Sequence, residues 1–289
     1  MTGESERTET FPLPDKTGKK AFPFSLACPS FVYPADYVDN VRHLAPFVDE
    51  IELLFFESRF TDSPPSPALV KELAQLARAG GISYNVHLPT DIFPGHRESA
   101  VRRKAVDVLA NVIDRCAPLA PTTFTLHLMR DPSEPDLHRW QARAAESIQA
   151  VLANGYSSRR ISVENLDDGF ETTASVIVDL DLSICLDMGH LMARGADVAA
   201  CYDRWEKRIT AVHLHGVEGA QDHLPLNRLS PAHMQKVMGV LNRFSGVVSL
   251  ELFSFEALNA SLKHLLDHWL IMKRDASSRI PSSLQSNLV

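Results

Sequence analysis

Eight short apolar segments that alternate with longer helical patterns constrain the fold of this 289-residue chain more than any other feature. Each is bounded by Pro, Gly, Asp or Ser and is rich in β-branched or apolar residues, which is typical of β-strands. They occupy residues 22–30, 48–57, 82–89, 123–128, 160–166, 183–189, 209–216 and 246–253. Because parallel strands need a helical crossover between them, this alternation predicts a parallel sheet with helices around it.

The segments between the strands favour helices. Residues 67–79 have apolar side chains at helical spacing and are followed by the glycine pair Gly80 and Gly81, a typical C-terminal cap. Further helices are predicted at 98–116, 136–153, 197–206, 231–244 and 255–273, with shorter ones at 36–46 and 170–179. The segment CPSFVYPAD after the first strand lacks the glycine-rich turn of an open nucleotide-binding sheet. We therefore predict an α/β fold, a single (β/α)₈ barrel.

Composition sets the limits of this domain and its partners. Residues 1–20 are polar and are predicted to be a disordered tail, residues 21–273 form the barrel, and residues 274–289 form a second tail. A net charge of −7 argues against a general nucleic-acid binder. No signal peptide or membrane-spanning run is recognised, and the four cysteines are scattered. We expect a cytoplasmic enzyme with a small-molecule substrate, no nucleic acid and no membrane partner, in an oligomeric state that the sequence leaves open.

Six consecutive predicted strands end in a histidine or a carboxylate, each flanked by apolar residues. In chain order these are His87, His127, Glu164, Asp187, His213 and Glu251. Alternation along a strand turns the apolar neighbours toward the helices and the polar residues toward the barrel axis. Active sites of such barrels lie at these strand ends. Burying so many ionisable groups is costly, and a divalent cation offsets this cost.

Further polar residues follow these strands. His190 lies after the sixth strand, His215 ends the seventh, and Asp222 and His223 lie in the next loop. A single histidine on a strand is more often a structural residue than a ligand, and Asp187 could simply cap a turn. The joint pattern nevertheless indicates a metal site, because imidazole and carboxylate bind zinc, manganese and iron. Glu52 and Glu57, which have opposite parity on the second strand, remain alternatives as site residues.

The set Glu164, Asp187, His213 and Glu251 resembles the metal ligands of the xylose isomerase-like barrel superfamily, which contains sugar isomerases, epimerases and endonuclease IV. The resemblance covers residues 22–269. His87 and His127 resemble additional ligands of the nuclease-like branch, in which Glu164 would bridge two metals. His190, Asp222 and His223 resemble the third-metal set of that branch. There the motif is usually Asp-x-His, whereas here the two residues are adjacent.

Several local phrases resemble the cobamide-remodelling phosphodiesterase family. They are FVYPADYVDNVRHLAPFVDEIELLFFES (31–58), YNVHLPTD (84–91), SVENLDDGF (162–170), CLDMGHL (185–191), HLHGVEGAQDHLPL (213–226) and VVSLELFS (247–254). This resemblance implies hydrolysis of a phosphoester bond in the nucleotide loop of cobamides, the vitamin B12 group, so that the lower ligand can be exchanged.

These roles can be assigned as hypotheses. Two or more divalent metals are expected, with zinc preferred and manganese, iron or cobalt as alternatives. Glu164 and Glu251 are the predicted catalytic carboxylates. His215, Phe31 and Tyr33 are predicted substrate contacts, and His215 could instead support a ligand. The alternative function is a sugar isomerase or epimerase that uses one metal and the Glu164/Glu251 pair. A barrel that merely binds a ligand is a third alternative.

Overall fold

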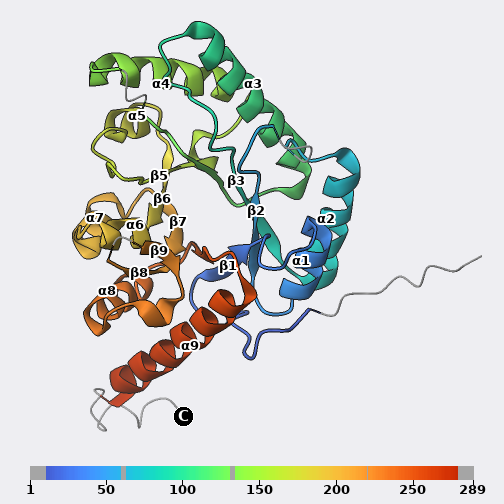
Figure 1. Ribbon diagram of the computed structural model, residues 1–289, viewed down its shortest axis with the longest axis vertical. Helices are drawn as coiled ribbons and strands as arrows, with labels where there is room; N and C mark the ends of the chain where they lie inside the picture. Colours follow the sequence, from blue (N-terminus) through green and yellow to red (C-terminus); the bar gives the residue numbers. More distant parts are fainter. Residues whose placement is uncertain (1–10, 60–62, 131–133, 220, 279–289) are drawn as a thin grey trace, which may run out of the picture.

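The computed structural model describes residues 11–59, 63–130, 134–219 and 221–278, and it confirms the predicted barrel. Eight parallel strands close in the order β1-β10-β7-β6-β5-β4-β3-β2 (Figure 1). They are β1 (Ser25–Pro29), β2 (Glu50–Leu54), β3 (Ser83–His87), β4 (Phe124–Leu126), β5 (Ile161–Glu164), β6 (Ser183–Asp187), β7 (Ile209–Leu214) and β10 (Val247–Leu250). Each lies within a segment that the sequence predicts as a strand.

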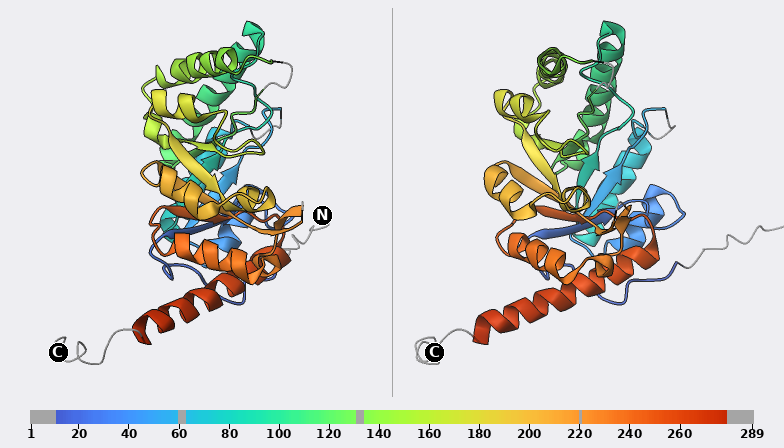
Figure 2. Two further views of the ribbon diagram at one scale, coloured as in Figure 1. Left: turned by 90° about the vertical axis from the view of Figure 1, so that its left-hand side faces the viewer. Right: turned by 60° about the vertical axis from the view of Figure 1, so that its left-hand side comes forward.

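Helices surround the ring of strands (Figure 2). They are α1 (Tyr37–Leu44), α2 (Pro67–Gly80), α3 (Ser99–Cys116), α4 (Leu137–Leu152), α5 (Ala174–Asp179), α6 (Met188–Ala193), α7 (Val198–Trp205), α8 (Pro231–Leu241) and α9 (Phe255–Ser278). Gly81 caps α2 with a left-handed φ of 59°, as the glycine pair predicts. The sequence did not predict the short helix α6 or the hairpin formed by β8 (Gly216–Glu218) and β9 (Gln221–Leu224).

The strands separate an apolar shell from a polar barrel interior. Tyr84 and Val86 on β3 are fully buried, and the Tyr84 hydroxyl donates to Leu73 O of α2. Asn85, between them in sequence, donates instead to Glu50 of the neighbouring strand. This alternation follows from the pleat of the strand. Polar residues of the strands therefore face the axis, and those at the carboxyl ends meet at one mouth of the barrel.

At both ends of the barrel domain, the structure extends beyond the limits that the sequence predicts. Residues 1–10 lie outside the described part, but residues 11–20, predicted as disordered, contact the barrel. Lys16 forms an ion pair of 2.6 Å with Asp267 of α9, and Lys19 donates to two backbone carbonyls. A sequence of low apolar content is held here by polar contacts, which hydrophobic patterning does not detect. Helix α9 continues to Ser278, beyond the predicted boundary at residue 273. Residues 279–289 of the predicted second tail lie outside the described residues.

Among the described helices, none is both long and apolar enough to cross a membrane. All four cysteines are free thiols, and three of them are buried.

Candidate metal centre

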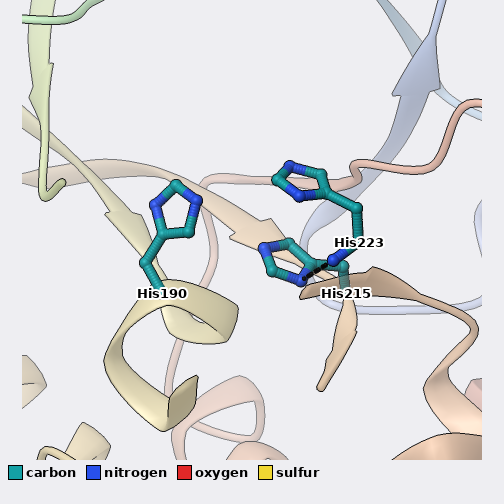
Figure 3. A group of neighbouring side chains, drawn as sticks. All are labelled: His190, His215 and His223. Carbon is teal, nitrogen blue, oxygen red and sulfur yellow. Dashed lines mark hydrogen bonds between the residues drawn. The ribbon is translucent and has the colours of Figure 1, made fainter. Parts of the chain in front are cut away.

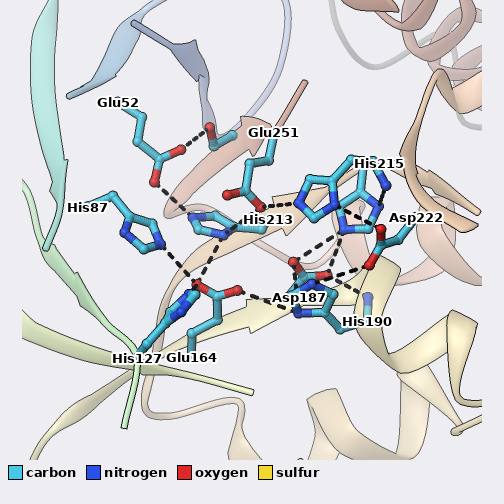
Figure 4. A network of polar contacts seen from close by, with 12 residues as sticks. Glu52, His87, His127, Glu164, Asp187, His190, His213, His215, Asp222 and Glu251 are labelled. Atoms are coloured by element: carbon cyan, nitrogen blue, oxygen red, sulfur yellow. Dashed lines mark hydrogen bonds and ion pairs between the residues drawn. The ribbon is translucent and has the colours of Figure 1, made fainter. Parts of the chain in front are cut away.

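The six strand-end residues meet at the carboxyl mouth of the barrel, where they form one connected network (Figure 4). Glu164 lies at its centre, with 2% of its surface exposed. Its Oε2 atom is 3.1 Å from His127 Nε2, 3.5 Å from His87 Nε2 and 3.4 Å from His213 Nδ1. One carboxylate oxygen thus faces three imidazole nitrogens that come from β3, β7 and the end of β4.

Three groups of potential ligands share Glu164. The first contains His87, His127 and Glu164, the second contains Glu164, Asp187, His213 and Glu251, and the last joins Glu164 and His213 to the buried thiol of Cys185. Within each group the ligand atoms lie within 4.8 Å of one another. A shared carboxylate between two such groups is the arrangement expected of a bridging ligand between two cations.

Hydrogen bonds to the second ring nitrogen orient two of these histidines. His87 Nδ1 lies 2.9 Å from Leu88 O, and since a carbonyl only accepts, Nδ1 carries the proton. His213 Nε2 likewise donates to Glu52 Oε1 at 2.9 Å. In the neutral rings, the remaining nitrogens, His87 Nε2 and His213 Nδ1, would present their lone pairs toward Glu164. Metal-binding histidines typically show this division of their two nitrogens.

Three buried polar atoms of the network lack a hydrogen-bond partner among the described residues. They are His87 Nε2, His213 Nδ1 and Glu251 Oε2. Buried polar atoms are otherwise almost always paired. These three point into the space that the ligand groups enclose, and His213 Nδ1 lies 3.2 Å from Glu251 Oε2. The donor set, three imidazoles and three carboxylates on six strands, therefore fits divalent metal ions.

Asp187 and Asn165 organise the start of α6. The Asp187 side chain accepts from His190 N at 2.7 Å and caps the helix, so the alternative role as a cap holds beside its place in the ligand group. Asn165 brackets the Asp187 backbone, donating to its carbonyl and accepting from its N–H. The Asn165 carbonyl also accepts from His190 Nδ1 at 3.1 Å, so Nε2 is the ring nitrogen that faces Asp222. The sequence contained Asn165 beside Glu164 but gave no signal of this role.

A separate group of histidines lies on the α6 and hairpin side of the mouth. His190, His215 and His223 have ligand atoms within 4.8 Å of one another (Figure 3). Asp222 also faces this group, with its Oδ2 atom 3.8 Å from His190 Nε2. The adjacent Asp222 and His223 reach the same site because His223 adopts a left-handed φ of 51°, a conformation that costs a non-glycine residue energy. The departure from the Asp-x-His spacing is thereby accommodated.

His215 contacts Asp187 rather than lining an open surface. It is fully buried, and its Nε2 atom lies 3.3 Å from Asp187. Its Nδ1 atom accepts the backbone N–H of His223 at 2.9 Å, so in the neutral ring Nε2 carries the proton and donates to Asp187. A side chain at Gly189 would meet this ring at 2.0 Å. Of the two roles predicted for His215, the geometry favours orientation of Asp187 over substrate contact.

Ion pairing inside the cluster shifts several pKa values. Burial raises the pKa of Glu164, but His127 and His213 outweigh it and hold that pKa well below its ordinary value. The pKa of Glu251 is lowered in the same way by His213 and His223. Conversely, burial opposes charge on His223, while Glu251 and Asp222 raise its pKa to about 9. The centre therefore offers ionised carboxylates together with imidazoles that hold protons until a cation replaces them.

Phe31 and Tyr33, the two aromatic residues predicted to contact the substrate, differ in exposure to solvent. Phe31 is 44% exposed and packs edge-on against Tyr37. Tyr33 is only 3% exposed, its hydroxyl donates to Pro12 O, and its ring stacks on Phe255. A substrate contact by Tyr33 is therefore not supported, because residues that precede the barrel cover it. Phe253, which was not predicted, is 44% exposed and stacks on His223 with centroids 5.3 Å apart.

Glu52 on β2 and Glu57 after it, the two remaining candidate site residues, lie in different surroundings. Glu52 lies inside the barrel with no exposed surface and contacts His213, whereas Glu57 pairs with Arg59 outside the network. Of these two alternatives from the sequence, Glu52 is the one that shares the parity of the inward residues of β2. Its partner on β7 could not be read from the sequence.

Comparison with known families agrees with this geometry. Residues 47–271 match the family described as xylose isomerase-like TIM barrel. The chain therefore belongs to that family. A search of curated proteins found no match.

Solved structures with the same fold include enzymes of both predicted kinds. A D-tagatose 3-epimerase-like protein is 17% identical, with a TM-score of 0.70 over 88% of this chain and 100% of that one. An L-ribulose 3-epimerase is 17% identical, with a TM-score of 0.66 over 90% and 98%. Endonuclease IV from Thermus thermophilus is 22% identical, with a TM-score of 0.65 over 86% and 99%. At these identities the likeness establishes the fold alone.

Proposed function

We propose that this chain is a metal-dependent hydrolase of a phosphoester bond. The observation that carries the proposal is the first ligand group, in which His87 and His127 add a second ion position to Glu164. Epimerisation needs one metal and a pair of proton-transferring carboxylates. A second metal position is what in-line displacement at phosphorus uses, since both the attacking and the leaving oxygen need stabilisation.

The ligand groups would hold different metal ions. Glu164 would bridge two metals, His87 and His127 would hold one, and the remaining ligands of the four-residue group would hold the other. His190, Asp222 and His223 would hold a third ion or contact the phosphate. When bound, zinc or another divalent metal supplies an acidified water and neutralises phosphate charge. Glu164 and Glu251 are suited to remain ionised as ligands, because the neighbouring histidines lower their pKa values.

The substrate that we propose is a cobamide, cut in its nucleotide loop. Support comes from the local phrases that resemble the cobamide-remodelling phosphodiesterases, in particular those around His87, His190 and Asp222. The exposed rings of Phe31 and Phe253 are compatible with a flat substrate. A small molecule also suits the net charge of −7, which does not favour a nucleic-acid backbone.

A sugar isomerase or epimerase is the second candidate. The comparisons taken by themselves favour it, because several of the similar structures are sugar epimerases. The four-residue group would hold one metal, and Glu164 and Glu251 would move protons on the two faces of the substrate. On this alternative His87 and His127 would not hold a second metal, although His87 Nε2 is buried and unpaired among the described residues.

Incubation of the purified enzyme with a complete cobamide, with and without a chelator, tests the proposal. We expect a corrinoid product that lacks the lower ligand to appear in chromatography, and this product should vanish with chelator. Parallel assays with ketohexoses test the second candidate. Epimer formation without any phosphoester cleavage, in protein that contains one metal per chain, would replace the proposed function with epimerisation.

A further inference from the structure

Glu52 is a buried carboxylate that the roles above do not use. It lies on β2, has no exposed surface, and is surrounded by the barrel interior. Its Oε1 atom accepts from His213 Nε2 at 2.9 Å, and its Oε2 atom accepts from Ser249 Oγ at 2.5 Å.

Strands β1 and β10 separate β2 from β7 in the barrel, so Glu52 reaches His213 through the interior. A buried carboxylate is costly unless its oxygens are paired, and both oxygens are.

The contact fixes which nitrogen of His213 is available. With Nε2–H donated to Glu52, the neutral ring that binds a cation has its lone pair on Nδ1. That atom faces Glu164 at 3.4 Å and Glu251 at 3.2 Å, and no described residue donates a hydrogen bond to it. The opposite tautomer would place a proton between His213 and the two carboxylates, in the position that a cation requires.

Glu50 provides an internal comparison on the same strand. It is also fully buried and shares the inward parity of Glu52, but it accepts from Ser83, Asn85 and Thr122. None of these partners belongs to a ligand group. Glu50 therefore links neighbouring strands, whereas Glu52 accepts a hydrogen bond from His213 of the metal centre.

We infer that Glu52 is a positioning residue that holds the metal-binding tautomer of His213, and that Ser249 locks the rotamer of Glu52. The inference rests on the metal centre of the proposed function and applies equally to hydrolysis and epimerisation, because His213 belongs to the four-residue group. Hydrogen-bonded partners of ligating histidines typically contribute about 10- to 100-fold to metal affinity.

The test compares Glu52→Leu, Glu52→Gln and the matched control Glu50→Gln in the full chain. Zinc affinity is measured by competition with a chromophoric chelator, on samples shown to be folded by circular dichroism. Glu52→Leu should bind zinc about 10- to 100-fold more weakly at the four-residue group. Glu52→Gln should stay within about threefold, since its amide oxygen can still accept from Nε2–H. Glu50→Gln should leave zinc affinity unchanged. Undiminished affinity in folded Glu52→Leu would overturn the inference.

A measurement on the unaltered protein guards against failure of Glu52→Leu to fold. In zinc-loaded protein with ¹⁵N-labelled histidine, His213 should show a protonated Nε2 and a metal-bound Nδ1. The opposite assignment overturns the inference even without any variant. Because neither readout involves a substrate, this outcome is independent of whether the enzyme cleaves phosphoesters, so the two proposals can fail separately.

Discussion

The two outer ligand groups of the centre are held by different kinds of structure. His87, His127 and Glu164 stand on or directly after barrel strands, and their side chains are 0%, 18% and 1% exposed. His190, His223 and Asp222 stand on α6 and the β8–β9 hairpin, with side chains 16%, 27% and 44% exposed. We call the first set the strand group and the second set the hairpin group. Closure of the barrel positions the strand group, whereas the hairpin group depends on the β8–β9 hairpin and on the left-handed conformation of His223.

The comparison predicts that the strand group is the more important for hydrolysis. Replacing His87 or His127 with Ala should lower phosphodiester hydrolysis about a thousandfold or more, because loss of one cation removes several kcal/mol of transition-state stabilisation. Elemental analysis should find one metal fewer per chain, with an unchanged circular dichroism spectrum. The exposed His138 of α4 offers a control, and His138→Ala should behave as the original protein. Full activity in both strand-group variants would refute the two-metal arrangement.

Changes in the hairpin group should have a smaller effect. Asp222→Ala and His223→Asn are expected to lower the rate about 10- to 100-fold and to weaken one metal position, since each removes one partly exposed partner. Asn tolerates the left-handed conformation of residue 223, so the hairpin should persist. Steady-state kinetics and metal titration measure both effects. Losses equal to those of His87→Ala would erase the distinction between the two groups.

The pH dependence of metal binding should originate partly in the hairpin group. The pKa of His223 is raised to about 9, against the effect of burial, by Glu251 and Asp222. His223 is therefore protonated at neutral pH, and a cation must displace that proton. Affinity should fall as the pH drops from about 9 to 6, by up to about tenfold per pH unit for each proton released. Calorimetry in buffers of different ionisation enthalpy counts these protons.

His223→Asn is the control for this dependence, because it removes the titrating ring while keeping the backbone conformation. The proton count should fall by one in that variant. An unaltered count would assign the protons to other histidines of the centre, such as His213, whose pKa is also raised well above its ordinary value against burial.

The smallest effect is expected at the outer edge of the hairpin. Arg228 pairs there with Glu218, and both side chains are more than half exposed. Such surface pairs contribute about 0–1 kcal/mol. Arg228→Ala should therefore leave the free energy of unfolding and the catalytic rate nearly unchanged in denaturant titrations and kinetic assays. A loss of rate comparable to that of Asp222→Ala would show that the hairpin is held from outside rather than by its contacts with the centre.

Much of the fold and the set of strand-end residues could be predicted, because both depend on local alternation. The alternation of polar and apolar residues around Glu164 and His213 predicts which face of each strand is polar. Parallel strands of a barrel then bring their carboxyl ends together at one mouth. The adjacency of Asp222 and His223 departs from the Asp-x-His motif of the branch that the sequence resembles. The structure places both side chains near His190, with His223 in a left-handed conformation that the sequence did not indicate.

By itself, then, the sequence determined the barrel, the inward faces of its strands and the residues that gather at its mouth. The tertiary structure alone decided which atoms meet there. Glu52 contacts His213 from 161 positions away, Tyr33 is covered by residues that were expected to form a tail, and His215 supports Asp187. The physical reason is that periodicity fixes the direction of a side chain, whereas its partner and tautomer depend on closure of the barrel and on hydrogen bonds across it.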